Sequence, residues 1–251
     1  MLYAKLCGHR DQPDVFLLGD SRMGKTKLME QFIKAHAPEF INNAGVREKP
    51  VLMVEVDQPS VKKLMLEILD TSVTPYNPDS TPDKLFYQVI NLLHECNTKM
   101  LVIDEIQSLY QGTPREVTAI TRFIKRLSNK TGISITGVGV TTARQLLKVD
   151  EQYANRFVAV TMPRWEASVA FQQFLMGFES CLPLKLPSGL SSPEISAVIL
   201  EKSEGNTARI EELVLGCARQ AIITGRERID LEMLRKPRWT TDSFGTREAV
   251  L

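Results

Sequence analysis

The chain has 251 residues, which is enough for one α/β domain with an appendage or for two small domains. Hydrophobic residues make up 43% of the sequence and charged residues 24%, as in ordinary globular proteins. The formal net charge is +1, so no global field favours nucleic acid, and any contact with DNA must come from a local basic patch.

Neither membrane insertion nor secretion is predicted. No apolar run approaches the length of about 18 residues that a membrane span needs, and the first fifteen residues lack the apolar segment of a secretory signal. The four cysteines are scattered without a metal-binding spacing: Cys7, Cys96, Cys181 and Cys217. We therefore expect thiols in a reducing cytosol rather than a zinc site.

The first strong pattern is a strand, a glycine-containing loop and a helix. Val15–Leu18 predicts a buried strand, residues 19–26 form the loop, and Lys27–Ala37 predicts a helix. The apolar residues at helical spacing are Leu28, Phe32 and Ala35. This order is the context that Gly-x-x-x-x-Gly-Lys-Thr requires of a phosphate-binding loop, and a chance Gly-Lys-Thr turn is the alternative.

The loop has the chemistry of a nucleotide site. Gly19 and Gly24 let the intervening backbone N–H groups turn inward as an anion-binding nest at a helix N-terminus. Lys25 supplies a positive charge for the β- and γ-phosphates, and the Thr26 hydroxyl is suited to ligate Mg²⁺. The residues that we expect to contact the nucleotide here are Gly19, Asp20, Ser21, Arg22, Met23, Gly24, Lys25, Thr26 and Lys27.

Four further strands follow the loop and complete a five-stranded parallel sheet flanked by helices, in a nucleotide-binding domain over residues 1–162. The predicted strands are Val51–Val56, Met100–Asp104, Ile133–Val138 and Phe157–Thr161. Helices are predicted after a Ser60 cap to about Leu69, from a hydroxyl cap at Ser80-Thr81 to near Cys96, over Glu116–Thr131, and over Thr141–Val149. Pro38–Pro50 is expected to be a loop.

Only helical patterns follow Pro163. They predict a small helical lid over residues 163–236 and a tail over residues 237–251 that has no core pattern. The lid helices are predicted at Trp165–Glu179, Pro193–Glu204, Thr207–Thr224 and Leu231–Leu234.

An acidic pair ends the strand before residue 105. Asp104 lies where a carboxylate holds the Mg²⁺ shell from the side opposite Thr26. Glu105 is the candidate to orient and polarise water for attack on the γ-phosphate. A strand-ending acidic pair at a helix cap is the alternative. The run Asn129–Gly132 lacks the Asp of an Asn-Lys-x-Asp guanine-reading motif, which favours ATP.

Three residues outside the loop are candidates to contact the γ-phosphate. Thr141, after the fourth strand, either senses it or caps the following helix. Arg156 lies where ring ATPases place an Arg that reaches a neighbour's ATP, and a surface ion pair with the preceding acidic residues is the alternative. Arg209 would read the phosphate from the lid, or instead pair with Glu212.

Taken together, these motifs resemble the TniB/TnsC family. The residues that carry the resemblance are Gly19–Thr26, Ile103–Glu105, Gly139–Ala143, Asp150–Gln152, Asn155–Phe157 and Glu204–Arg209. Members of this family are AAA+ ATPase regulators of DNA transposition, similar in role to MuB and IstB. The similarity runs from about Val15 to Leu234.

The resemblance implies a bacterial cytoplasmic, DNA-associated protein with the AAA+ fold that uses ATP and Mg²⁺. Such a protein assembles as a homo-oligomeric ring or filament on duplex DNA, without sequence preference, and works with a transposase and a target-selection protein. The alternatives are a helicase or clamp loader of the same superfamily and an ATP-dependent signalling switch that does not bind DNA.

The resemblance also requires DNA contacts in a central pore. Lys62 and Lys63 are candidates for phosphate contact, together with Thr81 and its backbone N–H. A solvated lysine pair and a plain helix cap are the alternatives. A rival basic patch on the helix 116–131 contains Arg122, Lys125, Arg126 and Lys130.

Overall fold

The structure, a computed structural model, describes residues 14–71, 75–148 and 157–236. These residues divide into two compact units with a boundary between Met162 and Pro163, except that residues 22–24 group with the second unit. Each unit has its own hydrophobic core. Within the described ranges, no helix is both long enough and apolar enough to cross a membrane.

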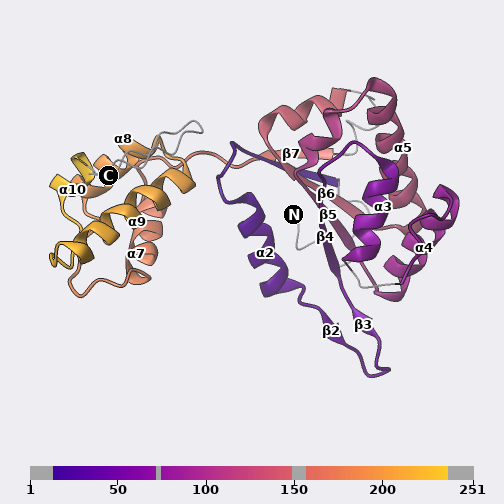
Figure 1. Ribbon diagram of the computed structural model, residues 1–251, viewed down its shortest axis with the longest axis horizontal. Helices are drawn as coiled ribbons and strands as arrows, with labels where there is room; N and C mark the ends of the chain where they lie inside the picture. The colour runs from indigo at the N-terminus through magenta and orange to yellow at the C-terminus, as the bar shows by residue number, and fades with distance from the viewer. Residues whose placement is uncertain (1–13, 72–74, 149–156, 237–251) are drawn as a thin grey trace. The chain divides into compact units, whose positions relative to one another are not determined.

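The first unit is built on the five-stranded parallel sheet that the sequence predicts (Figure 1). Its strand order is β4-β5-β6-β1-β7, and every neighbouring pair is parallel. The strands are β1 (Asp14–Leu18), β4 (Val51–Glu55), β5 (Met100–Asp104), β6 (Ser134–Gly139) and β7 (Phe157–Thr161). Leu18 pairs with Gly139, and Ile103 pairs with Gly137. The segments that follow β1, β5 and β6 therefore leave the sheet at the same edge.

Helices cover both faces of this sheet. The helix α2 (Lys25–His36) lies on one face, and α3 (Val61–Asp70), α4 (Pro82–Glu95) and α5 (Pro114–Thr131) pack together on the other. Successive residues of β5 alternate between the two layers. Leu101 and Ile103 belong to the core under α3–α5, whereas Met100 and Val102 join Met29 of α2. Because both faces are buried, β5 is an uninterrupted apolar run until Asp104.

The buried face of α2 differs from the predicted one. Leu28 is 48% exposed, whereas Met29 is fully buried. The helix begins at Lys25, whose side chain is itself buried. Residues four apart share a helix face, so burying Lys25 turns Met29 toward the sheet and Leu28 toward solvent.

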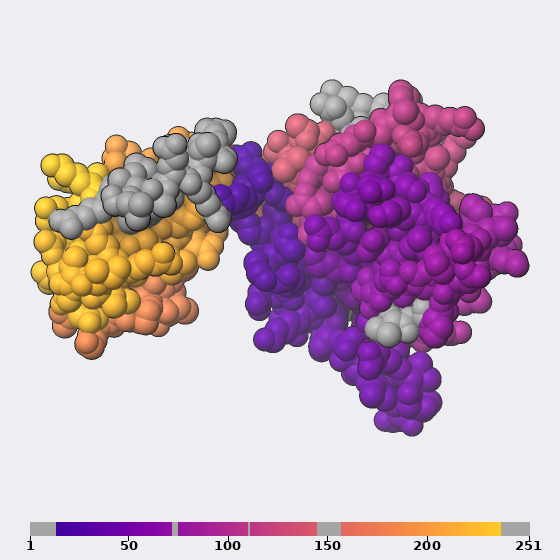
Figure 2. Space-filling model, in the orientation of Figure 1, coloured from indigo at the N-terminus to yellow at the C-terminus, as the bar shows by residue number. Residues whose placement is uncertain are grey.

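The predicted loop over residues 38–50 contains a short hairpin. Its strands are β2 (Phe40–Ile41) and β3 (Arg47–Glu48), and it projects from the first unit (Figure 1, Figure 2). The Asn42 side-chain oxygen accepts hydrogen bonds from the backbone of Ala44 and Val46, at 2.9 and 3.0 Å. This asparagine turn closes the hairpin, and strands of two residues are too short to show an alternating pattern.

Helix starts match the prediction in part. The helix α5 begins two residues earlier than predicted, because Thr113 and Glu116 form a reciprocal capping box ahead of Pro114. Thr81 occupies the N-cap position of α4, but its side chain makes no capping hydrogen bond, so the predicted hydroxyl cap is wrong. Two 3₁₀ turns follow β5 and β6: η1 (Ile106–Tyr110) and η2 (Thr141–Lys148).

The second unit is helical. Its helices are α7 (Val169–Ser180), α8 (Pro193–Ser203), α9 (Thr207–Ile223) and α10 (Leu231–Arg235). The predicted helix start at Trp165 is wrong, because Ser168 caps α7 by accepting a hydrogen bond from Phe171 N at 3.2 Å. Trp165 instead donates its backbone N–H to Gly205 O at 2.9 Å and stacks on Phe174.

This contact predicts different costs at two glycines. Both Gly205 (φ +69°) and Gly189 (φ +68°) are left-handed, but a Cβ at Gly205 would overlap the Trp165 carbonyl, whereas one at Gly189 meets open space. We expect Gly189→Ala to lower the free energy of unfolding by about 1–2 kcal/mol, and Gly205→Ala by a further ~1–3 kcal/mol. Urea denaturation followed by tryptophan fluorescence measures both, and equal losses would contradict the close packing at Gly205.

Candidate functional site

The loop between β1 and α2 is shaped by its close neighbours and by two left-handed residues. Arg22 (φ +62°) and Gly24 (φ +87°) have positive φ. Gly19 N donates to Gly139 O at 3.2 Å, and a Cβ at Gly19 would press on Met162. The loop then enters α2 at Lys25, so the N–H groups of the first helical turn, which have no partner within the helix, lie directly after it, as anion binding requires.

Lys25 folds back onto the loop. Its Nζ donates to Gly19 O at 3.2 Å and to Asp20 O at 2.7 Å, and its side chain is buried. Burial lowers the pKa of Lys25, while the nearby carboxylates of Glu105, Asp104 and Asp20 act in the opposite direction. A buried ammonium whose hydrogen bonds go to two carbonyls is well prepared to exchange them for phosphate oxygens.

The loop contacts the end of β5 directly. Thr26 Oγ1 donates to Asp104 Oδ2 at 2.6 Å, and Glu105 N donates to Asp104 Oδ1 at 2.9 Å. Asp104 is 4% exposed. The structure thus brings together a hydroxyl and a carboxylate that lie 78 residues apart in the sequence.

Glu105 follows in an uncommon backbone conformation, with φ +52° at the N-cap position of η1. Its carboxylate accepts a hydrogen bond from Gln107 Nε2. The negative charge of Glu105 also raises the pKa of Lys25 against the lowering by burial, which shows that the two groups are close enough to interact. Among non-glycine residues, left-handed backbone is uncommon and concentrates at functional sites.

Gln107 is the site residue that sequence reasoning missed. Besides donating to Glu105, its Oε1 accepts from Val140 N at 3.1 Å, immediately after β6. The sequence held no signal for it, because Gln107 meets both partners only in the folded chain, in a turn where Ile106 and Leu109 are fully buried. Thr141 is the first residue of η2, not its cap, and its side chain is exposed.

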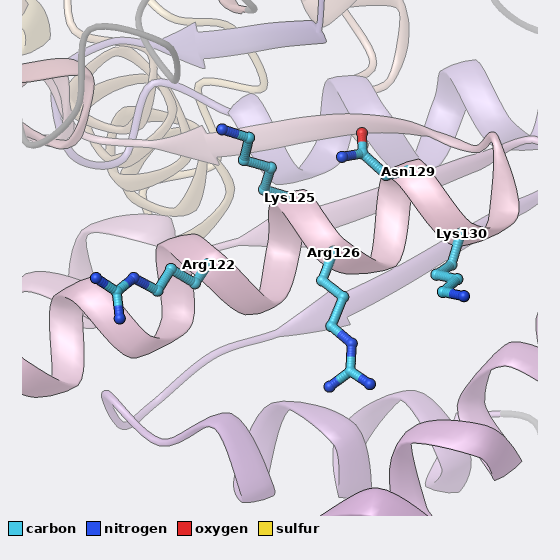
Figure 3. Close-up of a pocket in the computed structure, with 5 residues that line it drawn as sticks. All are labelled: Arg122, Lys125, Arg126, Asn129 and Lys130. Atoms are coloured by element: carbon cyan, nitrogen blue, oxygen red, sulfur yellow. The ribbon is translucent and has the colours of Figure 1, made fainter.

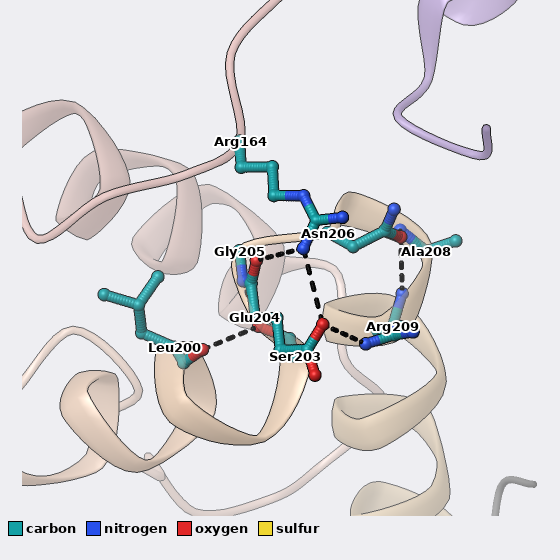
Figure 4. Close-up of polar contacts among 8 residues, drawn as sticks. All are labelled: Arg164, Leu200, Ser203, Glu204, Gly205, Asn206, Ala208 and Arg209. Carbon is teal, nitrogen blue, oxygen red and sulfur yellow. Dashed lines mark hydrogen bonds and ion pairs between the residues drawn. The ribbon is translucent and has the colours of Figure 1, made fainter. Parts of the chain in front are cut away.

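Of the two candidate arginines, the structure describes the contacts of Arg209 alone. Arg156 lies outside the described residues. Arg209, in the first turn of α9, makes an ion pair with Glu204 at 2.7 Å rather than the alternative pair with Glu212 (Figure 4). Asn206 caps this helix by accepting from Arg209 N at 3.3 Å. The contact of Arg209 with the γ-phosphate of a bound nucleotide stays a prediction.

The candidate DNA contacts lie at the starts of two packed helices. Lys62, in the first turn of α3, is exposed. Lys63 is half-buried, and its Nζ lies 3.8 Å from Asp57 Oδ2. Thr81, at the start of α4, is exposed and keeps its hydroxyl out of the helix cap.

The rival basic patch is a shallow depression of about 550 Å³ along α5 (Figure 3). It is lined by Arg122, Lys125, Arg126, Asn129 and Lys130. Figure 3 shows Arg126 and Lys130 extending from one side of the helix, with Lys125 and Asn129 on the other. The Arg126 guanidinium lies 4.1 Å above the centre of the Phe86 ring, so this cation also has a packing role.

Solved structures with a similar fold are AAA+ proteins. The ORC2 protein of Aeropyrum pernix in its ADP form superposes with a TM-score of 0.67 over 93% of this chain at 15% identity. Cdc6p of Pyrobaculum aerophilum gives 0.58 over 91% at 15% identity, and the A. pernix ORC1 protein in complex with DNA gives 0.57 over 92% at 15% identity. The chain spans 63–64% of the length of these proteins. At such identities the likeness shows the fold.

A search of curated proteins finds no match. The family model described as "Bacterial TniB protein" matches residues 2–167, which is more than half of the chain. That stretch contains the phosphate-binding loop, Asp104-Glu105 and the end of β6. The chain therefore belongs to the TniB family, a family of P-loop AAA+ ATPases.

Proposed function

We propose that this chain binds and hydrolyses ATP in order to assemble on duplex DNA and regulate transposition. The observation that carries the proposal is the Thr26–Asp104 hydrogen bond, which joins the phosphate-binding loop to the acidic end of β5 beside Glu105. Membership of the TniB family supports the transposition role. The likeness to an ORC1 protein solved with DNA agrees with a DNA-bound state.

In this proposal each part of the site has one task. Residues 19–24 and Lys27 hold the phosphates through backbone N–H groups and flanking side chains, and Lys25 exchanges its carbonyl contacts for phosphate oxygens. Glu105 accepts a proton from the water that attacks the γ-phosphate. Thr141 and Arg209 contact the γ-phosphate, and Arg156 acts on the ATP of a neighbouring protomer.

The donor set fits a bound Mg²⁺. Thr26 and Asp104 offer a hydroxyl and a carboxylate oxygen 2.6 Å apart. Across the described ranges, no group of three or more His, Cys, Asp or Glu could hold a metal by itself. That suits an ion that takes its remaining ligands from phosphates and water. When bound, Mg²⁺ neutralises phosphate charge in such sites.

We further propose that DNA is held by Lys62, Lys63 and Thr81 within a homo-oligomeric ring or filament. Lys62 is exposed at a helix start, and the Thr81 hydroxyl, which is not used as a cap, suits a phosphate together with the adjacent N–H groups. A single protomer offers few contacts, so affinity would come from assembly along the duplex. A transposase and a target-selection protein would bind this assembly.

Two variants separate nucleotide binding from hydrolysis. We expect Lys25→Ala to weaken ATP binding by about 1.5–3 kcal/mol, because a charged hydrogen-bond donor is removed. Glu105→Gln should keep ATP bound while hydrolysis falls by about 10²–10⁴-fold. Binding of a fluorescent ATP analogue and phosphate release measure the two, with Lys34→Ala, an exposed lysine of the same helix, as the matched control. Wild-type hydrolysis in Glu105→Gln would contradict the assignment of the base.

Arg156 is expected to act across a protomer boundary. Arg156→Ala and Glu105→Gln should each be inactive alone, whereas a mixture should regain part of the activity, because some interfaces then combine one intact Glu105 with one intact Arg156. Hydrolysis is measured over a range of mixing ratios, with assembly checked by electron microscopy. No recovery at any ratio, while both variants still assemble, would refute a shared site.

The DNA surface is tested by salt dependence. If Lys62 binds a phosphate group, Lys62→Ala should weaken binding equally for all duplex sequences and lower the slope of log K against log salt by about 1 for each phosphate released. Fluorescence anisotropy of labelled duplexes measures this with a non-hydrolysable ATP analogue. Arg122→Ala is the matched comparison on α5. An unchanged slope in Lys62→Ala with a reduced slope in Arg122→Ala would move the DNA-binding surface to α5.

A further inference from the structure

Gln107 connects two parts of the proposed nucleotide site, namely Glu105 and the loop after β6 that carries Thr141. Its amide nitrogen donates to the Glu105 carboxylate, and its amide oxygen accepts from Val140 N at 3.1 Å. Val140 directly precedes Thr141, the candidate sensor of the γ-phosphate. One side chain thus spans from the proposed base to the loop after β6.

The surroundings leave Gln107 little freedom. It is partly buried in η1, between Ile106 and Leu109, which are both fully buried. A Cβ at Gly139 would overlap Gln107 Oε1, so only glycine at position 139 leaves space for the amide in this position. Gly139 O in turn accepts from Gly19 N at 3.2 Å, which ties the same strand end to the phosphate-binding loop.

Glu105 needs such a partner because its backbone does not fix its carboxylate. The side chain starts from a left-handed residue at the beginning of a short turn, and its own carbonyl is engaged by Ser108 N at 2.8 Å. A carboxylate that must align water against a phosphate gains from a donor that restricts its rotamers. An amide suits this task, since it gives a hydrogen bond to Glu105 and takes one from Val140.

We infer that Gln107 is the positioning residue of this site: it holds Glu105 toward the γ-phosphate and couples that orientation to the loop that carries Thr141. The inference rests on the proposed role of Glu105 in ATP hydrolysis. Gln107 touches neither water nor nucleotide in this role and acts through Glu105 alone.

Two substitutions separate the donor from the acceptor. Gln107→Leu removes both hydrogen bonds, whereas Gln107→Glu keeps an acceptor for Val140 N and loses the donor to Glu105. We expect both variants of the full chain to lower kcat for ATP about tenfold or more, with KM for ATP changed less than about twofold. The control Gln111→Leu, an exposed glutamine that follows the same turn, should hydrolyse ATP at the wild-type rate.

Two further variants test the route through Glu105 and Gly139. In the Glu105→Gln background, adding Gln107→Leu should cause no further loss of kcat, because the carboxylate that it orients is gone. Gly139→Ala should lower kcat as Gln107→Leu does, because the new methyl group displaces the amide.

The outcomes distinguish this inference from the function on which it rests. Wild-type kcat in Gln107→Glu would show that only bracing of Val140 matters and would overturn the inference. A further loss of kcat on adding Gln107→Leu to Glu105→Gln would also overturn the inference. If instead Glu105→Gln retains wild-type hydrolysis, the proposed function itself fails. The melting temperature of each variant is measured and compared with that of Gln107→Glu, which keeps the acceptor for Val140 N. This comparison separates a loss of activity from a loss of folding.

Discussion

The hydrogen bond from Thr26 to Asp104 joins the two halves of the proposed nucleotide site, and it depends on how the strands of the first unit are aligned. Thr26 lies in the first turn of α2, which follows β1, whereas Asp104 ends β5, and β6 lies between these two strands. The contact therefore requires the register of three parallel strands to be correct. Asp104 is buried with a partner on each oxygen, so the carboxylate meets the loop in one defined position.

The same constraint extends into the packing around the loop. Lys25 must lie inside the loop, and this fixes the rotation of α2 so that Met29 reaches the sheet. On the other side of Asp104, the left-handed Glu105 starts η1, from which Gln107 reaches back to Val140. The proposed phosphate binding, the packing of α2 and the orientation of the proposed base thus depend on a few neighbouring backbone positions.

The sequence was sufficient for elements whose periodicity is strong and insufficient where tertiary contacts decide. The five apolar strands and the phosphate-binding loop could be predicted because both sheet faces are buried and the loop motif has strict spacing. Met29 was missed because helical spacing alone does not say which of two adjacent stripes is buried. The strands of the Asn42 hairpin are too short to show a periodic pattern. The pattern around Trp165 predicts a helix, but in the structure Trp165 precedes the helix and donates its backbone N–H to Gly205 O. Gln107 could not be assigned because its two partners meet it only in the folded chain.

In the proposed function, ATP binding at this site enables the chain to bind DNA. Co-sedimentation of the wild-type protein with random-sequence duplex DNA tests it most directly, in parallel with ATP, with a non-hydrolysable ATP analogue, with ADP and without nucleotide. We expect binding with ATP and the analogue, and little binding with ADP or without nucleotide. Equal binding in all four conditions, or no binding with the analogue, would contradict it.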